Sequence, residues 1–171
     1  MSQNTTPSLT DWAKTRIGSL YELHSTSGEE QQAQQTGAGL VFAPNVQIFH
    51  NHKQTSPEDF QKEISQTFGS VGSSVEWKEC VEVPGEDSRE GIVAGFLVVT
   101  RTLKFRIRAG PAKNNTFVSF SAKIEEDANS EADGQGDRRR IVQLFHTSSS
   151  KAAPVHLHGM QTHSSQGEKT A

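Results

Sequence analysis

Two hydrophobic periods follow one another along the chain, a helical one in the first half and a period of two in the second. After a polar lead over residues 1–8, apolar side chains recur at helical spacing to about residue 24. Ser8 or Thr10 can cap this first helix, because a side-chain oxygen there accepts a bond from a free amide of the first turn. Residues 25–39 are rich in glutamine and glycine and predict a loop or one short helix. The apolar stripe of the first helix consists of Trp12, Ala13, Ile17, Leu20, Tyr21 and Leu23.

An apolar strand over residues 41–50 ends in a His-Asn-His sequence and is followed closely by a second helix. Ser56 is the expected N-cap of that helix, with Pro57 at its first position and Asp59 able to return a capping-box bond. Phe60, Ile64 and Phe68 form a narrow apolar stripe, and Gly69 and Gly72 end the helix. Alternate residues of a strand share a face, so one face of the strand carries Val46, Ile48, His50 and His52.

The period then changes to two, which predicts further strands over residues 75–83, 92–105, 117–126 and 138–148. Turns at 84–91 and 108–115 and an acidic loop at 127–137 separate them. Gly95, inside the second of these strands, is typical of a bend or bulge. We expect one domain over residues 9–148 and a disordered tail over residues 149–171, which are rich in serine, histidine and glutamine.

The order of the elements, helices first and strands afterwards, predicts an α+β fold rather than a parallel, doubly wound sheet. We expect a curved, mostly antiparallel sheet that forms a cone and is covered by the N-terminal helices. The convex face of this sheet is then free, and we expect it to form a homodimer.

Composition narrows the functional classes. Of the 171 residues, 32% are hydrophobic, and the net charge of −3 argues against a dedicated nucleic-acid-binding protein. The arginines at 138–140 are surrounded by carboxylates and are interpreted as a solvated strand start. Cys80 is the only cysteine, so no intrachain disulfide can form. The sequence shows neither a secretory signal nor an apolar run long enough for a membrane span, so we expect no membrane association and a cytoplasmic protein.

Three stretches resemble the nuclear transport factor two-like superfamily, also called SnoaL-like. They are FAPNVQIFHNHKQTSPEDFQKEI, GIVAGFLVVTRTLKF and RRRIVQLFHT, and the resemblance covers residues 9–148. It implies a cone-shaped α+β barrel with a pocket, often in a homodimer. The superfamily includes isomerases, dehydratases, cyclases, epoxide hydrolases and non-catalytic binding modules, so the fold does not select a function. The chain lacks the tyrosine-and-acid set of ketosteroid-isomerase-like sites and the Asp-Arg-Asp set of limonene-epoxide-hydrolase-like sites. No catalytic residue is therefore carried over from either.

Four ionisable residues interrupt the apolar phase of the predicted strands: His50, Glu79, Arg101 and His146. If all these strand faces point into the cone, the four side chains share one pocket. Glu79, His146 and His50 are then the candidate catalytic residues, because a carboxylate beside a histidine makes a tunable acid–base pair. An arginine could keep that carboxylate ionised or bind an anionic ligand. The candidate ligand-binding residues are Arg101, Trp77, Tyr21 and Phe120.

The same four positions also allow a purely structural interpretation. Glu79 could lie beyond the cover of the helices, and a bulge in its strand could turn Arg101 outward. The two histidines could be satisfied residues at the rim of the sheet.

Two histidine groups resemble metal ligands: His50 with His52, and His156 with His158 and His163. Zinc needs three or four ligands with supporting partners, and neither group stands near a cysteine pair or a second ligand motif. We therefore expect neither a metal nor another cofactor.

Two functions fit these observations. The preferred one is a non-catalytic binding or dimerisation module with a pocket for a small apolar molecule. The alternative is a cofactor-free isomerase, dehydratase or cyclase that acts on a carbonyl-bearing metabolite.

Overall fold

The computed structural model describes residues 7–22, 39–65, 70–107 and 110–154. Helix α1 (Leu9–Ser19) begins where the Ser8 hydroxyl accepts a hydrogen bond from the Asp11 amide at 3.0 Å. Helix α3 (Pro57–Ser65) is capped in the same way by Ser56, whose hydroxyl accepts from the Asp59 amide at 3.1 Å. Both helices begin where the sequence predicts, because a side chain satisfies a first-turn amide in each. Helix α1 ends at Ser19 and a turn follows over residues 20–22, so the predicted continuation to about residue 24 is wrong. The predicted continuation of α3 to Phe68 lies outside the described residues.

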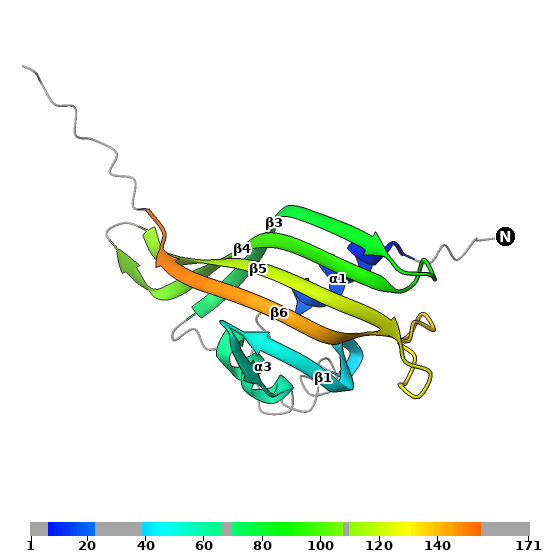
Figure 1. The fold of residues 1–171 in the computed structure, drawn as a ribbon. Coiled ribbons are helices and arrows are strands. Elements are labelled where there is room, and N and C mark those ends of the chain that lie inside the picture. Colours follow the sequence, from blue (N-terminus) through cyan, green and yellow to red (C-terminus); the bar gives the residue numbers. More distant parts are fainter. Residues whose placement is uncertain (1–6, 23–38, 66–69, 108–109, 155–171) are drawn as a thin grey trace, which may run out of the picture.

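The strands form a single six-stranded sheet in the order β2-β1-β6-β5-β4-β3. All neighbours are antiparallel except β1 and β6, which confirms the predicted α+β fold with a mostly antiparallel sheet. The sheet is curved but not closed (Figure 1). The strands are β1 (Phe42–His50), β2 (Lys53–Thr55), β3 (Ser70–Pro84), β4 (Gly91–Ile107), β5 (Gly110–Glu126) and β6 (Arg139–Ala152).

Both helices pack on one face of the sheet, which we call the inner face (Figure 1). The apolar sides of α1 and α3 form one continuous core with the inward residues of the strands. The opposite face, which we call the outer face, has no helix of the described chain against it. The largest fully buried apolar side chains of the core are Leu9, Val41, Ile48, Phe60, Val93, Leu97, Val99, Ile124, Ile141 and Leu144.

The His-Asn-His end of β1 is a tight hairpin turn. His50 pairs with Lys53, and the two residues between them, Asn51 and His52, have φ angles of 47° and 66°. Two positive φ angles are the mark of a two-residue turn of type I′, which matches the twist of the flanking strands. The sequence predicts that the helix follows β1 directly, and the short strand β2 that this turn creates was not predicted.

Strand β6 is longer than predicted. It continues to Ala152 because its polar end pairs with β5, with Thr116 and Ser150 hydroxyls 2.8 Å apart. The predicted boundary at residue 148 is therefore four residues early. Residues 155–171 of the predicted tail lie outside the described residues.

The interpretation of the arginine triplet as a solvated strand start is wrong for two of its three residues. Arg139 and Arg140 are each 1% exposed, while Arg138 is exposed. Arg139 donates to both oxygens of the Asp137 carboxylate and lies 5.6 Å from the Trp12 ring centre. Arg140 donates to the main-chain carbonyls of Gly39 and Glu131. Buried guanidinium groups persist here because a carboxylate, a ring and carbonyls replace water.

Candidate functional site

Four side chains meet on the inner face of the sheet, between α1, α3 and the ends of β1 and β6. They are Tyr21, His50, Phe60 and His146, and we call them the inner cluster. His50 and His146 are register partners on the parallel pair β1 and β6, and their ring centres lie 4.9 Å apart. Phe60 of α3 packs edge-on against both rings, at 5.6 and 5.0 Å. The structure therefore brings together the two histidines and Tyr21 that the sequence nominated for one site.

A chain of hydrogen bonds runs through this cluster from the core to the surface. The Tyr21 hydroxyl lies 2.5 Å from His146 Nε2, and His146 Nδ1 lies 2.9 Å from His50 Nδ1. His50 Nε2 lies 3.4 Å from the exposed Glu63 carboxylate. With Tyr21 donating to His146 and His146 to His50, the Nε2 of His50 can donate to Glu63, because a carboxylate only accepts. The same Nε2 also lies 3.3 Å from the Asn51 amide nitrogen. Sequence reasoning missed Glu63, which reaches His50 from the neighbouring helix α3.

Burial sets the charge state of the two innermost groups of this hydrogen-bonded series, Tyr21 and His146. His146 is 3% exposed, and its burial, with a smaller contribution from His50, lowers the pKa of its imidazole to about 3. Burial also raises the pKa of the Tyr21 phenol far above its usual value, against a smaller opposing effect of Arg101. At neutral pH the pair is therefore a neutral imidazole and a neutral phenol. Such a pair can pass a proton along the series of hydrogen bonds, but neither of its two groups is charged.

Arg101 lies close enough to Tyr21 to affect its pKa, yet its hydrogen bonds go elsewhere. Its guanidinium donates to the main-chain carbonyls of Ile64 and Ser65, in the last turn of α3. Those carbonyls have no partner within the helix, and a cation there also complements the helix dipole. Burial lowers the pKa of Arg101, with Tyr21 opposing. The bulge that could have turned this residue outward is absent at its position in β4, and Arg101 is 3% exposed.

The remaining aromatic candidates, Trp77 and Phe120, contact each other on the inner face. Their rings meet edge to face at 5.9 Å. Phe120 covers Gly95, where an added Cβ would lie 2.8 Å from the Phe120 ring and 2.9 Å from the Glu79 carbonyl oxygen. Gly95 is thus required by close packing, in agreement with its architectural interpretation. Trp77 packs against the core, and Phe120 lies directly across from His146 of the inner cluster, its register partner on β6.

Glu79 does not join this group, and the assumption that it shares the inward phase of Trp77 is wrong. Trp77 pairs with Leu97 but Glu79 pairs with Phe96, so β3 carries one extra residue, Lys78, at a bulge. A bulge shifts the alternation of side chains by one. Beyond it Cys80 and Glu82 point inward, while Glu79 is exposed. The role of Glu82 was also missed: its carboxylate accepts from the amide and hydroxyl of Thr10 in the first turn of α1.

The outer face carries apolar side chains at its centre. Phe49 and Phe145 are register partners whose rings stack at 5.0 Å with 10° between their planes. The same row continues across the sheet through Ser121 and Ala94 to Val81. Exposed fractions are 49% for Phe145, 39% for Phe96 and 44% for Ile92. We call Phe49, Val81, Ile92, Phe96 and Phe145 the outer patch.

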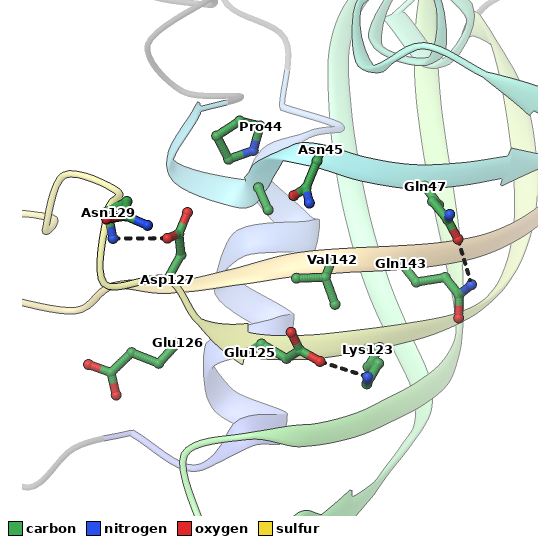
Figure 2. Close-up of a pocket in the computed structure, with 11 residues that line it drawn as sticks. Pro44, Asn45, Gln47, Lys123, Glu125, Glu126, Asp127, Asn129, Val142 and Gln143 are labelled. Atoms are coloured by element: carbon green, nitrogen blue, oxygen red, sulfur yellow. Dashed lines mark hydrogen bonds and ion pairs between the residues drawn. The ribbon is translucent and has the colours of Figure 1, made fainter.

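A hollow of about 630 Å³ lies beside this patch, over one end of β1, β5 and β6 (Figure 2). Figure 2 shows Lys123 paired with Glu125, and Gln143 hydrogen-bonded to Gln47. The hollow opens on the outer face, away from the inner cluster. Its lining is mostly polar, which differs from the apolar pocket that the sequence predicts. The other lining residues are Ala43, Pro44, Asn45, Glu126, Asp127, Asn129 and Val142.

Neither a cluster of metal ligands nor a membrane-spanning helix occurs in the described part of the chain. No three His, Cys, Asp or Glu residues of that part converge as metal ligands would. His156, His158 and His163 lie outside it. None of the helices within it is both long and apolar enough to cross a membrane.

Comparison with known proteins gives a fold but no specific activity. No family model matches the sequence, and no curated protein matches it either. Candida albicans Mtr2 superposes with a TM-score of 0.51 at 17% identity, covering 85% of this chain and 95% of its own. A putative scytalone dehydratase from Novosphingobium aromaticivorans superposes with a TM-score of 0.50 at 10% identity, covering 86% and 92%. These nuclear transport factor two-like proteins include an enzyme by name and a protein named without an activity, so the chain has the nuclear transport factor two-like (SnoaL-like) fold and no assigned subgroup.

Proposed function

We propose that this protein is a non-catalytic association module whose outer sheet face pairs with a second copy of the chain. The observation that carries the proposal is the outer patch, in which Phe145, Phe96 and Ile92 remain 39–49% exposed on a regular sheet. Several exposed apolar side chains on one face of a sheet are typical of an interaction site. Aromatic side chains with few charges between them are the composition of an interface core.

The size of the outer face is sufficient for a stable pair. Five strands about 4.8 Å apart and about twelve residues long, at about 3.3 Å each, cover roughly 19 Å by 40 Å. This is roughly 750 Å² for each partner, near the typical value of about 800 Å² for a specific complex. Two such faces can pack directly, because stacked sheets lie about 10 Å apart and interdigitate their side chains.

The inner cluster supports a structural role rather than a catalytic one. The Tyr21 hydroxyl is bonded to His146, the second His146 nitrogen is bonded to His50, and Arg101 is bonded to two carbonyls of α3. Phe60, which is 0% exposed, fills the space against both histidine rings. Each polar group therefore has a partner within the chain, which is how buried polar groups of a core are satisfied.

Analytical ultracentrifugation of the whole chain tests this proposal. We expect the wild type to sediment as a dimer at micromolar concentration. The double variant Phe96→Glu with Phe145→Glu should sediment as a folded monomer, because it places two carboxylates in the centre of the interface. Thr15→Glu is the matched control, since Thr15 is exposed on helix α1 and on the other side of the sheet. A monomeric wild type, or a dimeric double variant, contradicts the proposal.

A second candidate function is a cofactor-free isomerase, dehydratase or cyclase acting on a carbonyl-bearing metabolite. The hydrogen-bonded chain from Tyr21 to Glu63 favours it, because it could carry a proton between a bound molecule and solvent. The likeness to a putative dehydratase points the same way. Titrating the protein with a cyclic enone while following the His50 and His146 ring signals by NMR separates the two functions. Shifts of both rings that disappear in Tyr21→Phe support the enzyme, and unchanged rings support the association module.

A further inference from the structure

The outer face changes its charge from one end of the strands to the other. At the end reached by the last residues of β6 and the β4–β5 hairpin, its outward side chains include Arg106, Lys113 and Lys151, all exposed. Lys151 also lies 6.0 Å from the ring centre of Phe117 on the same face. We call these three residues the basic end. No carboxylate occurs in residues 98–107, 110–120 and 147–154, which form this part of the sheet together with the start of β3. On β3, Glu76 lies opposite Val98 and is paired with Lys78.

The opposite end of the same face is acidic. The hollow there is lined by Glu125, Glu126 and Asp127, against one lysine, Lys123. Lys123 is paired with Glu125 at 2.6 Å, so it neutralises one of the three carboxylates. Glu126 is also 3.3 Å from Arg89, which does not line the hollow. We call Glu125, Glu126 and Asp127 the acidic end, and it keeps an excess of negative charge facing the solvent.

The two ends lie at equal distances from Ser119 on β5. Lys113 and Glu125 each lie six residues from Ser119 along β5, and all three point to the outer face. Ser119 pairs with Phe96 on one side and with Thr147 on the other, two residues along the strand from the row that contains Ser121 and Phe145. Each end is therefore about 20 Å from Ser119, which lies level with Phe96 at one margin of the outer patch. The order along the face is basic, apolar, acidic.

An isologous pair requires a surface that is complementary to itself under a two-fold rotation. Two sheets in face-to-face contact are related by an axis that lies between them. If that axis runs along the strands, basic end meets basic end and acidic end meets acidic end. If it runs across the strands near Ser119, Phe96 of one copy faces Phe96 of the other, the row of Phe145 lies two residues from the axis, and each basic end lies over the acidic end of the other copy.

From this pattern we propose that two copies pair with their strands antiparallel, so that Lys113 and Lys151 of each copy reach the acidic hollow of the other. The inference rests on the proposed association through the outer face and specifies its orientation. The long lysine stems suit these positions, because twisted sheets separate toward their corners and a flexible side chain can span the wider gap. Like charges placed opposite one another disfavour the parallel arrangement, so the charges select the orientation.

Charges elsewhere on the outer face do not oppose this orientation. Glu76 on the edge strand β3 is paired with Lys78. Glu79 is also on β3, beside Phe96 in the central row of the sheet. An axis across the strands places β3 of one copy opposite β3 of the other, at the margin of the contact. Neither carboxylate therefore lies opposite the basic end.

A charge-reversal experiment with two complementary variants tests the orientation. The first variant carries Lys113→Glu and Lys151→Glu, and the second carries Glu125→Lys and Glu126→Lys. Each alone places like charges at both contacts, so its dimer dissociation constant should rise by about tenfold or more at low salt. Mixed in equal amounts, the two variants should form a heterodimer with nearly wild-type affinity, because both contacts are then complementary. Sedimentation of the mixture, with one variant fluorescently labelled, measures this.

A matched control separates contact from net charge. Lys14→Glu with Lys62→Glu makes the same charge change on helices α1 and α3, on the other side of the sheet. Mixed with the Glu125→Lys, Glu126→Lys variant, it should restore association only in part, because one of the two contacts is then complementary and the other remains like-charged. Full restoration by this control overturns the orientation, as does a failure of the complementary mixture to associate. If the charge variants dimerise like the wild type while the Phe96→Glu, Phe145→Glu variant is monomeric, the orientation is wrong but the proposed function stands. A wild-type monomer overturns both.

Discussion

The two faces of this sheet are made by the same strands, yet they differ in which side chains they bury and which they expose. On the inner face even the polar side chains are buried and paired within the chain, as Tyr21, His146 and Arg101 show. On the outer face apolar side chains such as Phe96 and Phe145 remain exposed, and charged residues gather at the two ends. The inner face therefore satisfies its polar groups within the chain, while the outer face leaves apolar side chains in contact with solvent.

The largest expected difference between the faces is in stability. Phe60→Ala removes a fully buried ring that contacts both histidines and Phe42, so it should cost about 3 to 5 kcal/mol of unfolding free energy. Phe96→Ala removes a ring that is 39% exposed on the outer face, and should cost about 1 kcal/mol or less. Urea unfolding at a concentration low enough to keep both proteins monomeric provides the comparison. Equal losses would mean that the outer patch is part of the core of a single chain.

The pH dependence of the unfolding free energy tests the inner cluster separately from the outer face. The folded-state pKa of His146 is about 3, below the value of 6.5 expected for the unfolded chain. The unfolded state therefore binds more protons in this range, and stability that is fully present above about pH 6.5 is lost progressively toward pH 3. The loss attributable to His146 is of the order of a few kcal/mol. The other groups that face this ring are Tyr21 and His50, with Glu63 beyond them.

His146→Gln provides the comparison for this prediction. Glutamine can donate and accept hydrogen bonds but does not titrate, so the slope of unfolding free energy against pH should be smaller in the variant between pH 6.5 and 3. Carboxylates also take up protons as the pH falls, but they contribute to both proteins and cancel in the difference. Identical slopes would show that His146 is protonated, or exposed, in the folded state.

Much of the inner face follows from sequence because its strands obey a simple alternation. Ile48 and His50, and Leu144 and His146, lie in one apolar phase, and both histidines point inward as that phase predicts. Arg101 also keeps the phase of Leu97 and Val99. Two kinds of segment could not be predicted from the sequence. In one, pairing with a neighbouring strand changes which side chains point inward; in the other, a distant residue supplies the hydrogen-bond partner of a buried group.

The buried arginines and the bulge in β3 show what local pattern cannot contain. Arg139 and Arg140 look solvated in a run of charges, but Asp137 and several main-chain carbonyls bring enough acceptors to bury them. In β3, both phases of VEWKECVEV contain apolar residues, so alternation cannot locate the extra residue. The pairing with β4 locates it, because Trp77 lies opposite Leu97 while Glu79 lies opposite Phe96. Register is a property of a pair of strands, and one strand read alone does not determine it.

The smallest expected effect provides the sharpest check of this register. Glu82, on the inward phase after the bulge, accepts from the Thr10 amide and hydroxyl at the N-terminal turn of α1. Glu82→Gln removes a negative charge from the positive end of that helix and should cost about 0.5 to 1 kcal/mol. Glu79→Gln is the matched control, three residues earlier on the same strand, with its side chain on the outer face, and should be near neutral. Thermal unfolding of the two variants, each at the same low concentration, decides the order. If Glu79→Gln were the more harmful, the strand would continue its alternation through Lys78, Glu79 would face α1, and the division of this edge strand between the two faces would be the reverse of the one described.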